Sequence, residues 1–343
     1  MADGGRGGRA AALAARAAVA TAGAAPRRPG TGMTAAAPTV SVVIPTVGRD
    51  TLGRAVAAAL AQSRPPVEVL VVVDGDGPPP TFADPRARAL PGHGAGPAAM
   101  RMTGARAAVG DLVAFCDDDD EWLPSKLSQQ VAAYQAAPTR RPAVISLCRD
   151  VDAAGRTLFE PVPGGGLPAG APLPHRLFRR CSLRQRTGLG GSSTILCDRE
   201  LLLAEPLRED LALHEDWEWL LRVDRRPDAG VVIVEAPLVR YRVNPPGTSA
   251  GSPADGWRRS VAFAHAAGLD RRTLGDFLLT VSGPMAVADG QLGPALRIAR
   301  DAVLRGRPGL PALSTFALLL VLPAPVRWRL GSWASRLLDR PTG

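Results

Sequence analysis

The sequence is poor in lysine and in aromatic residues. Lys126 is the single lysine among 41 basic Lys and Arg residues in the 343-residue chain, and aromatic residues make up 4%. A core must therefore rest on Val, Leu and Ala, which the hydrophobic content of 46% allows. The same arginine bias, with 37 Gly and 33 Pro, is typical of a GC-rich coding background and favours a bacterial origin.

Cysteine is also scarce, and its spacing excludes two classes of site. The four cysteines are Cys116, Cys148, Cys181 and Cys197, and no two of them are separated by two residues. This pattern indicates neither a zinc site nor a disulfide framework. We predict free thiols in a reducing compartment, and hence a cytoplasmic protein.

The net charge of +9 is concentrated at the two ends of the chain. The first 38 residues hold five arginines against one aspartate, and residues 251–343 hold twelve arginines against six aspartates. The middle of the chain is close to neutral and has no basic stripe interleaved with aromatics, so we do not expect nucleic acid as a partner. The basic ends better fit the anionic inner face of a cell membrane.

The chain has no apolar run long enough to span a bilayer. Residues 308–326 carry no charge but include four prolines, and the unbroken part, Ala312–Leu322, is about half the ~20 residues that a spanning helix needs. Basic, Trp and Leu residues follow up to Leu338, a composition typical of a helix lying in a membrane interface. A helix packed on the protein body or at a dimer contact is the equally open alternative.

Residues 1–38 consist mainly of Ala, Gly, Arg and Pro, which predicts a disordered extension. An export signal is disfavoured, because the apolar stretch holds only Leu13 as leucine and is broken by Arg16. Met33 is an alternative start that would make the upstream residues a misannotated leader.

From Thr39 onward, strands and helices alternate. Continuous apolar runs predict buried parallel strands at Val40–Ile44, Val67–Val73 and Leu112–Cys116. Predicted helices from residue 50 to 63, from 95 to 109 and from 124 to 136 separate and follow them. This alternation predicts a doubly wound, mainly parallel sheet flanked by helices, whose ligands bind at the carboxyl ends of the strands.

The later part of the chain is less regular. A Gly/Pro-rich loop is expected at 161–174, and residues after about 251 read as a helical extension. Further strands are predicted at Ala143–Leu147, Ser192–Leu196, Val231–Val234 and Leu238–Arg242, and a helix at His214–Arg226.

Four consecutive carboxylates, Asp117–Asp120, follow the third predicted strand directly. Like charges so close repel one another unless a cation or solvent neutralises them. Mg²⁺ and Mn²⁺ prefer such oxygen ligands and also bind phosphate oxygens. The run therefore predicts a divalent cation site at the ligand edge of the sheet. A solvated acidic turn or a helix N-cap is the alternative for any such run taken alone.

Three segments together resemble the opening motifs of family 2 glycosyltransferases, in order, spacing and strand-end position over roughly residues 39–136. They are Ser41–Thr46 (SVVIPT), Val69–Asp74 (VLVVVD) and Phe115–Pro124 (FCDDDDEWLP). His214–Glu218 (HEDWE) resembles the later acidic motif of that family, and Tyr241–Asn244 (YRVN) its closing segment. The resemblance implies a GT-A fold and transfer of a hexose from a nucleotide-diphosphate sugar to a hydroxyl acceptor with inversion.

The resemblance also implies roles for the matching residues of the nucleotide-binding half. Pro45, Thr46 and Arg49 would line the nucleotide pocket, Asp74 would accept a hydrogen bond from the base, and Arg101 would face the base or the phosphates. Asp117 and Asp118 would hold ribose and sugar hydroxyls, and Asp119 would ligate Mg²⁺ or Mn²⁺. The residue after Arg101 departs from the family pattern, because Met102 replaces the usual Asn.

Asp216 is the candidate catalytic base, with Glu215 beside it. Both lie in the first turn of a predicted helix, where the helix dipole favours negative charge. That preference alone explains many helix-start acids, so the base role rests on the resemblance. In the closing segment the family's usual His is replaced by Asn244, and Arg240 or Arg242 could supply charge to the diphosphate instead.

The predicted organisation is a leader at 1–38, a GT-A domain at 39–250 and a helical extension at 251–343 with membrane contact as one reading. Within the domain, residues 39–146 would bind the nucleotide and residues 147–250 the acceptor. The acceptor could belong to glycan, cell-envelope (polysaccharide) or metabolite synthesis, and it could be linked to a lipid. Two alternatives stay open. One is an enzyme that transfers a nucleotide onto a sugar phosphate, although Pro45–Arg49 lacks the Gly-rich loop with Lys that such an enzyme would need. The other is a non-catalytic partner subunit that binds a nucleotide sugar.

Overall fold

The computed structural model describes residues 37–322, except for 76, 93, 95, 165, 166, 169, 184 and 244–254. Within these, the residues from Pro38 onward form one unit. The predicted leader up to residue 36, Asn244, and the basic and Trp-rich segment after Leu322 lie outside the described residues.

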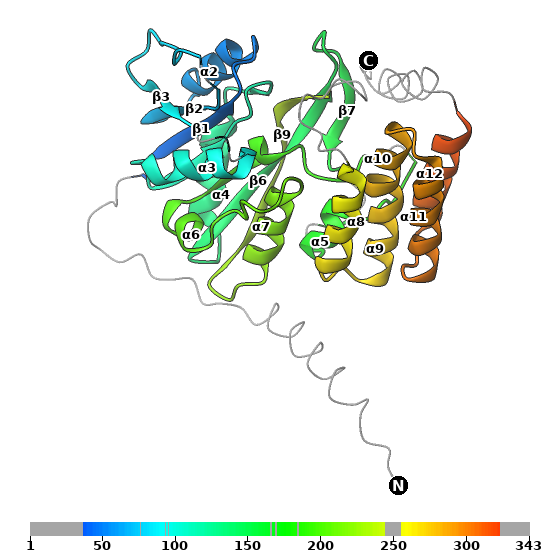
Figure 1. The fold of residues 1–343 in the computed structure, drawn as a ribbon. Coiled ribbons are helices and arrows are strands. Elements are labelled where there is room, and N and C mark those ends of the chain that lie inside the picture. Colours follow the sequence, from blue (N-terminus) through cyan, green and yellow to red (C-terminus); the bar gives the residue numbers. More distant parts are fainter. Residues whose placement is uncertain are drawn as a thin grey trace, which may run out of the picture. The chain divides into compact units, whose positions relative to one another are not determined.

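A mixed sheet with strand order β3-β2-β1-β4-β8-β6-β9-β5 forms the centre of the molecule, with β7 paired to β6 (Figure 1). Its strands are β1 (Val40–Thr46), β2 (Glu68–Val73), β3 (Ala87–Pro91), β4 (Leu112–Phe115), β5 (Glu121–Trp122), β6 (Arg141–Val151), β7 (Thr157–Val162), β8 (Ile195–Asp198) and β9 (Ala229–Arg242). Six of these nine described strands run in the same direction; β5, β7 and β8 run against their neighbours. The predicted doubly wound, mainly parallel sheet is confirmed.

Helices cover both faces of the sheet, because its strands are apolar on both sides. Along β1, Val43 packs into one core cluster, whereas Val42 and Ile44 pack into the other. The helices around the sheet are α2 (Leu52–Leu60), α3 (Gly96–Ala107), α4 (Lys126–Ala136), α5 (Leu173–Phe178), α6 (Arg199–Ala204) and α7 (Glu215–Asp224), with a 3₁₀ turn, η1 (Ser192–Thr194), before β8. Helices α3, α6 and α7 cover the first face, and α2 and α4 the second.

Several expectations about the second half change in the structure. The two strands predicted at Val231–Val234 and Leu238–Arg242 are one strand, β9, whose pairing with β6 shifts register after Val234. The predicted strand Ser192–Leu196 begins as the turn η1 and becomes a strand only at Ile195. The loop expected at 161–174 contains the end of β7 and the start of α5.

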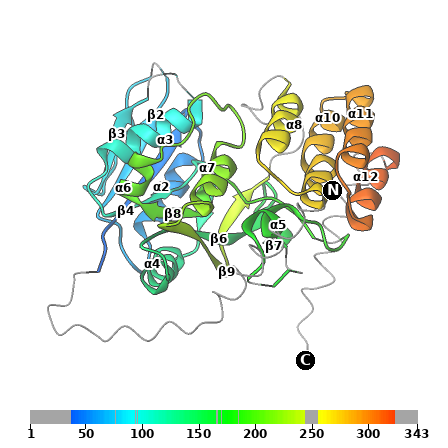
Figure 2. The ribbon, with the colours of Figure 1, turned by 90° about the horizontal axis from the view of Figure 1, so that it is seen from below.

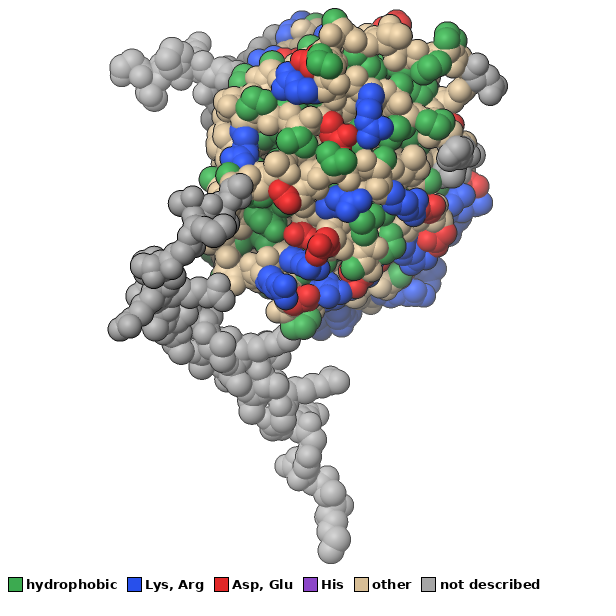
Figure 3. Space-filling model, turned by 90° about the vertical axis from the view of Figure 1, so that its left-hand side faces the viewer, with side chains coloured by type: hydrophobic (Ala, Val, Ile, Leu, Met, Phe, Trp, Pro, Cys, Tyr) green, Lys and Arg blue, Asp and Glu red, His purple; other side chains and the backbone are tan. Residues whose placement is uncertain are grey.

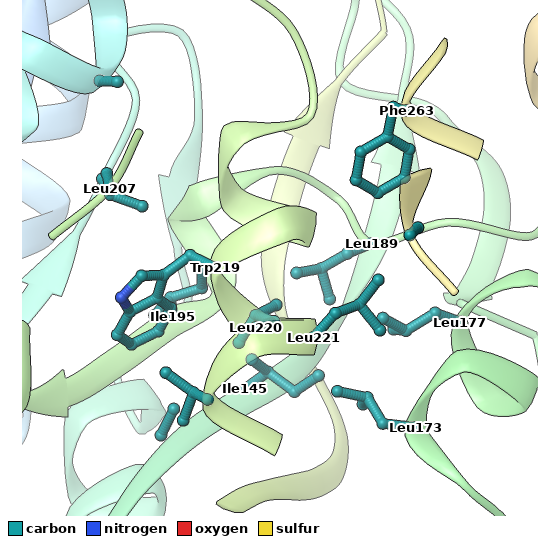
Figure 4. Packing of buried hydrophobic residues seen from close by; sticks show 14 of the residues in the cluster. Ile145, Leu173, Leu177, Leu189, Ile195, Leu207, Trp219, Leu220, Leu221 and Phe263 are labelled. Atoms are coloured by element: carbon teal, nitrogen blue, oxygen red, sulfur yellow. The ribbon is translucent and has the colours of Figure 1, made fainter. Parts of the chain in front are cut away.

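The core on the α7 side is built from helix residues that point at the sheet. Trp219, fully buried, lies between Ile195 of β8 and Leu207, and its indole N–H donates to the Glu205 carbonyl over 2.6 Å (Figure 4). Leu220 and Leu221, on the next positions of α7, are buried as the helical spacing predicts. The sequence did not single out Trp219.

The helical extension follows the sheet as predicted. It consists of α8 (Gly256–Ala266), α9 (Arg271–Phe277), a π-helical segment η2 (Leu278–Ser282), α10 (Gly283–Ala288), α11 (Leu292–Leu304) and α12 (Leu310–Val321). Figures 1 and 2 place these helices beside α5 and α7, at the far side of the sheet from β3. None of the helices in the described part of the chain is both long and apolar enough to cross a membrane.

Charged side chains of both signs are interspersed on the surface. On the side of the molecule that lies at the left in Figure 1, Figure 3 shows arginines mixed with aspartates and glutamates. Such mixing weakens the field of either sign at a distance.

His214 links α7 to the extension. Its ring stacks on Trp217 at 4.3 Å between centroids, and its Nε2 lies 3.0 Å from the Ser260 hydroxyl of α8. Phe263 of α8 and Phe277 of α9 pack around the same ring. Burial lowers the pKa of His214 from 6.5 to about 3, so the ring is neutral near pH 7.

This burial predicts a pH-dependent contribution to stability. Between pH 3 and 6.5 the unfolded chain binds one more proton at His214 than the folded chain, so the contribution is complete above pH 6.5 and is lost as the pH falls. We expect the free-energy difference between wild type and His214→Gln to shrink by about 2 kcal/mol from pH 7 to pH 5 in denaturant unfolding. His175→Gln is the control, and a constant difference for His214→Gln would contradict the prediction.

Candidate functional site

The carboxyl ends of β1, β2 and β4 meet at one edge of the sheet. The register pairs Thr46 with Val73, and the Asp74 N–H donates to the Thr46 carbonyl over 2.9 Å. Asp74 in turn accepts a hydrogen bond from the Gly94 N–H over 3.0 Å. Pro45, Thr46, Asp74 and the acidic run after β4 are therefore brought together at the edge where the sequence predicted a nucleotide, although their contacts with a nucleotide stay predictions.

Asp118 connects the first strand end to the acidic run. Its carboxylate accepts from the Thr46 hydroxyl over 2.5 Å and pairs with the Arg49 guanidinium over 2.5 Å. Since only 1% of the Asp118 side chain is exposed, little surface remains for the sugar contact that the resemblance implies. The observed role of Asp118 is to position Thr46 and Arg49.

The four aspartates alternate between exposed and buried side chains. Asp117 and Asp119 are 22% and 21% exposed, whereas Asp118 and Asp120 are buried. Asp120 accepts from the Arg242 N–H over 3.1 Å, and burial, together with Asp117 and Asp119, raises its pKa well above the usual value. Thus Asp117 and Asp119 are the two members of the run that can meet a ligand.

The surroundings of Asp119 agree with its predicted role as a metal ligand. Burial and the charge of Asp117 raise its pKa to about 6, against the opposing effect of Arg49, whose Nη1 lies 3.6 Å away. A cation would relieve this unfavourable charge. Within the described ranges, no group of three or more His, Cys, Asp or Glu residues is arranged to hold a metal, and the metal at Asp119 stays a prediction.

Arg101 joins the acidic run to α7. Gly104, one turn further along α3, lies so close to Val43 that a Cβ would meet its Cγ1 at 2.3 Å, so α3 rests directly on β1. Arg101 thereby lies over the strand ends, 6% exposed, and pairs with Asp117 over 2.6 Å and with Glu215 over 2.8 Å. Burial would lower its pKa, but the two carboxylates raise it above the usual value. Its observed partners are thus carboxylates; the nucleotide contact stays a prediction.

Asp216 lies beside this pair, in the first turn of α7. Its carboxylate accepts a hydrogen bond from the Trp217 N–H over 2.8 Å. Burial and the neighbouring Glu215 raise its pKa to about 7, while Arg101 opposes the shift. A carboxyl that titrates near neutral pH suits a general base.

A pocket of about 930 Å³ opens in front of Asp216. Arg101, Asp117, Glu215 and Asp216 line it, together with the Gly190-Gly191-Ser192 turn. Glycine is required at 190, because a Cβ there would meet the Cys148 Sγ at 2.1 Å. Pro45, Arg49, Asp74 and Asp119 do not line this pocket, so of the residues predicted to bind the nucleotide only Arg101 and Asp117 reach it.

Other residues of the site were not predicted. Ser193, fully buried, binds the Asp117 N–H through its hydroxyl over 2.8 Å, and Asp150 pairs with Arg186 inside the pocket over 2.6 Å. No local motif marks them, since their partners are distant in sequence. Arg240 pairs with Glu121, and Arg242 donates to main-chain carbonyls that include Asp119, so the protein itself already engages both guanidinium groups.

Solved structures of S. aureus TarS resemble this chain at low identity. The structure of TarS residues 1–349 has a TM-score of 0.45 at 17% identity, covering 88% of this chain and 93% of that one. The same fragment in complex with UDP-GlcNAc has a TM-score of 0.46 at 16% identity with the same coverage. These similarities are too distant to assign a donor or an acceptor. No curated protein matches the sequence.

The family model described as glycosyl transferase family 2 matches residues 41–145. This range contains β1, β2, β4, the acidic run and Arg101, the parts that carried the resemblance in the sequence. The observed mixed sheet with helices on both faces is also the GT-A type of fold that the resemblance implied. Residues 41–145, a little under a third of the 343-residue chain, are therefore similar to glycosyl transferase family 2.

Proposed function

We propose that the protein transfers a hexose from a nucleotide-diphosphate sugar to a hydroxyl acceptor, with inversion at the anomeric carbon. The observation that carries this proposal is the bridge through Arg101. It holds Asp117, which follows β4, next to Glu215 of α7, and all three residues line the same pocket as Asp216. A donor on one side and an acceptor on the other would then meet at Asp216.

The transfer requires one displacement. The acceptor hydroxyl gives its proton to the Asp216 carboxylate, and its oxygen forms a bond to the anomeric carbon. The bond from that carbon to the diphosphate oxygen breaks, and the nucleoside diphosphate leaves from the opposite face. Because attack and departure occur on opposite faces, the configuration inverts.

The nucleotide side would bind the donor through groups that the structure already orders. Thr46 and Arg49 are held by Asp118, and Asp74 is held beside them at the end of β2. Asp119 would ligate Mg²⁺ or Mn²⁺, which, when bound, neutralises charge on the leaving diphosphate. The full donor site would thus use strand ends for the nucleotide and Asp119 for the ion.

Replacing the base should separate turnover from donor binding. Asp216→Asn keeps the shape but cannot accept the proton, so we expect turnover to fall about 10²- to 10⁴-fold with donor affinity unchanged. Glu218→Gln, on the same helix turn but paired with Arg222, is the matched control and should keep most activity. Normal turnover in Asp216→Asn would exclude Asp216 as the base, and no turnover in wild type with any acceptor would favour a binding subunit.

The raised pKa of Asp216 predicts the pH profile. The base must be ionised, so kcat/KM for the acceptor should fall about tenfold per pH unit below pH 7 and level off above it. The profile is measured from pH 5.5 to 9 with donor and metal saturating. A flat profile down to pH 5.5 would contradict the assignment, and Asp216→Glu should move the inflection.

Loss of Asp119 should remove the dependence on metal. We expect one among UDP-, GDP- and dTDP-sugars to bind the full chain more tightly with Mn²⁺ than with EDTA, and Asp119→Asn to abolish that difference in isothermal titration. Glu121→Gln, two residues further and paired with Arg240, is the control. A difference that persists in Asp119→Asn would place the ion elsewhere.

A further inference from the structure

The pocket in front of Asp216 extends far beyond the catalytic carboxylates. At about 930 Å³ it is near the upper end of small-molecule sites, and its surface is mostly apolar. A sugar hydroxyl alone needs only the end at Asp216. The remaining volume must be explained by another part of the ligand.

An apolar wall of this pocket comes from the helical extension. Leu279 and Val281 of η2, Met285 of α10, and Leu318, Leu319 and Leu322 at the end of α12 line it. Leu318 is 48% exposed, although it faces the pocket. Across from them, β7 contributes Leu158 and Val162. An apolar ligand that covers such a surface removes it from water, which favours binding.

The polar groups further inside the pocket are held by other protein groups. Asp150 pairs with Arg186, the Thr187 hydroxyl donates to Thr280 over 3.0 Å, and Arg180 donates to the Leu183 carbonyl over 2.7 Å. Two buried nitrogens of lining residues, Arg180 Nε and Trp217 Nε1, have no hydrogen-bond partner among the described residues, whereas the paired groups place few demands on a ligand. The carboxylates and the apolar wall of the lining therefore decide which ligand fits.

We propose that the acceptor is an amphiphile: a hydroxyl-bearing head at Asp216 joined to an alkyl or polycyclic body that lies along the wall from η2, α10 and α12. This inference rests on the proposed function, since it places the acceptor hydroxyl at Asp216. Such a body could belong to a lipid anchored in a membrane or to a free apolar metabolite. The two share the same chemistry at the wall.

A series of alkyl glucosides tests the wall. Isothermal titration of the full chain with donor nucleotide present, using methyl, hexyl and octyl β-glucoside below their micelle concentrations, should show affinity rising with chain length. The gain is up to about fourfold for each methylene buried. Equal affinity for the methyl and octyl compounds would overturn the inference.

Two leucines of α12 provide a matched pair of variants. Leu318→Gln changes a residue of the wall, and we expect it to weaken octyl glucoside binding on the order of fivefold while the methyl compound changes little. Leu313→Gln changes a residue of similar exposure, 37%, that does not line the pocket, and should bind as wild type. Thermal unfolding of both variants checks that the fold is intact. Equal weakening in both, or in neither, would overturn the placement of the apolar body.

Donor turnover distinguishes failure of this inference from failure of the proposed function. If Asp216→Asn loses turnover but affinity is flat along the alkyl series, only the amphiphilic acceptor is wrong. If affinity rises along the alkyl series but Asp216→Asn keeps normal turnover, the pocket binds apolar ligands for another purpose. The acceptor assignment then fails together with the proposed function. Glucosyl-dioleoylglycerol in phosphatidylcholine vesicles, compared with soluble octyl glucoside, then separates the sources: preference for the vesicle-bound head indicates a lipid, and equal use a free metabolite.

Discussion

The buried arginine that joins two carboxylates is the interaction on which the site depends. Arg101 contacts Asp117, from the segment after β4, and Glu215, from α7, which are nearly one hundred residues apart. Removal of one partner from a buried charge group leaves the others uncompensated, at a cost of about 3–5 kcal/mol. The spacing between the nucleotide edge and the base helix is therefore fixed by an ion-pair triad as well as by apolar packing.

The same triad helps to explain why neighbouring acids differ in their partners. Glu215 pairs with Arg101 over 2.8 Å, whereas burial and the neighbouring Glu215 raise the pKa of Asp216, one residue on, to about 7. In the acidic run, the buried Asp118 pairs with Arg49 and the buried Asp120 accepts from the Arg242 N–H. Asp117 and Asp119 are the partly exposed members of the run. Two adjacent carboxylates thus acquire separate roles through their surroundings.

The first half of the fold could be predicted from the sequence because its signals are local. A run such as Val69–Val73 must be buried on both faces, and an acidic run directly after a strand marks the ligand edge. The short strands β3, β5 and β7 carry no such pattern, and β9 was divided in two because its register shift lies at Pro237. Likewise, Ser193 and Asp150 depend on contacts with residues far along the chain, which one sequence does not encode in any short window.

The division between the two halves bears on specificity. Residues 41–145, which match the family model, contain the strand ends predicted to bind the nucleotide and two residues of the pocket lining, Arg101 and Asp117. The rest of the pocket, from Asp216 to the apolar wall of α10 and α12, is built by chain outside that match. Because the extension lines the same cavity as Asp216, a change in its helices would change the shape of the proposed acceptor site without touching the proposed donor residues. Under the proposed function, the part of the chain with the least recognisable sequence would then select the acceptor.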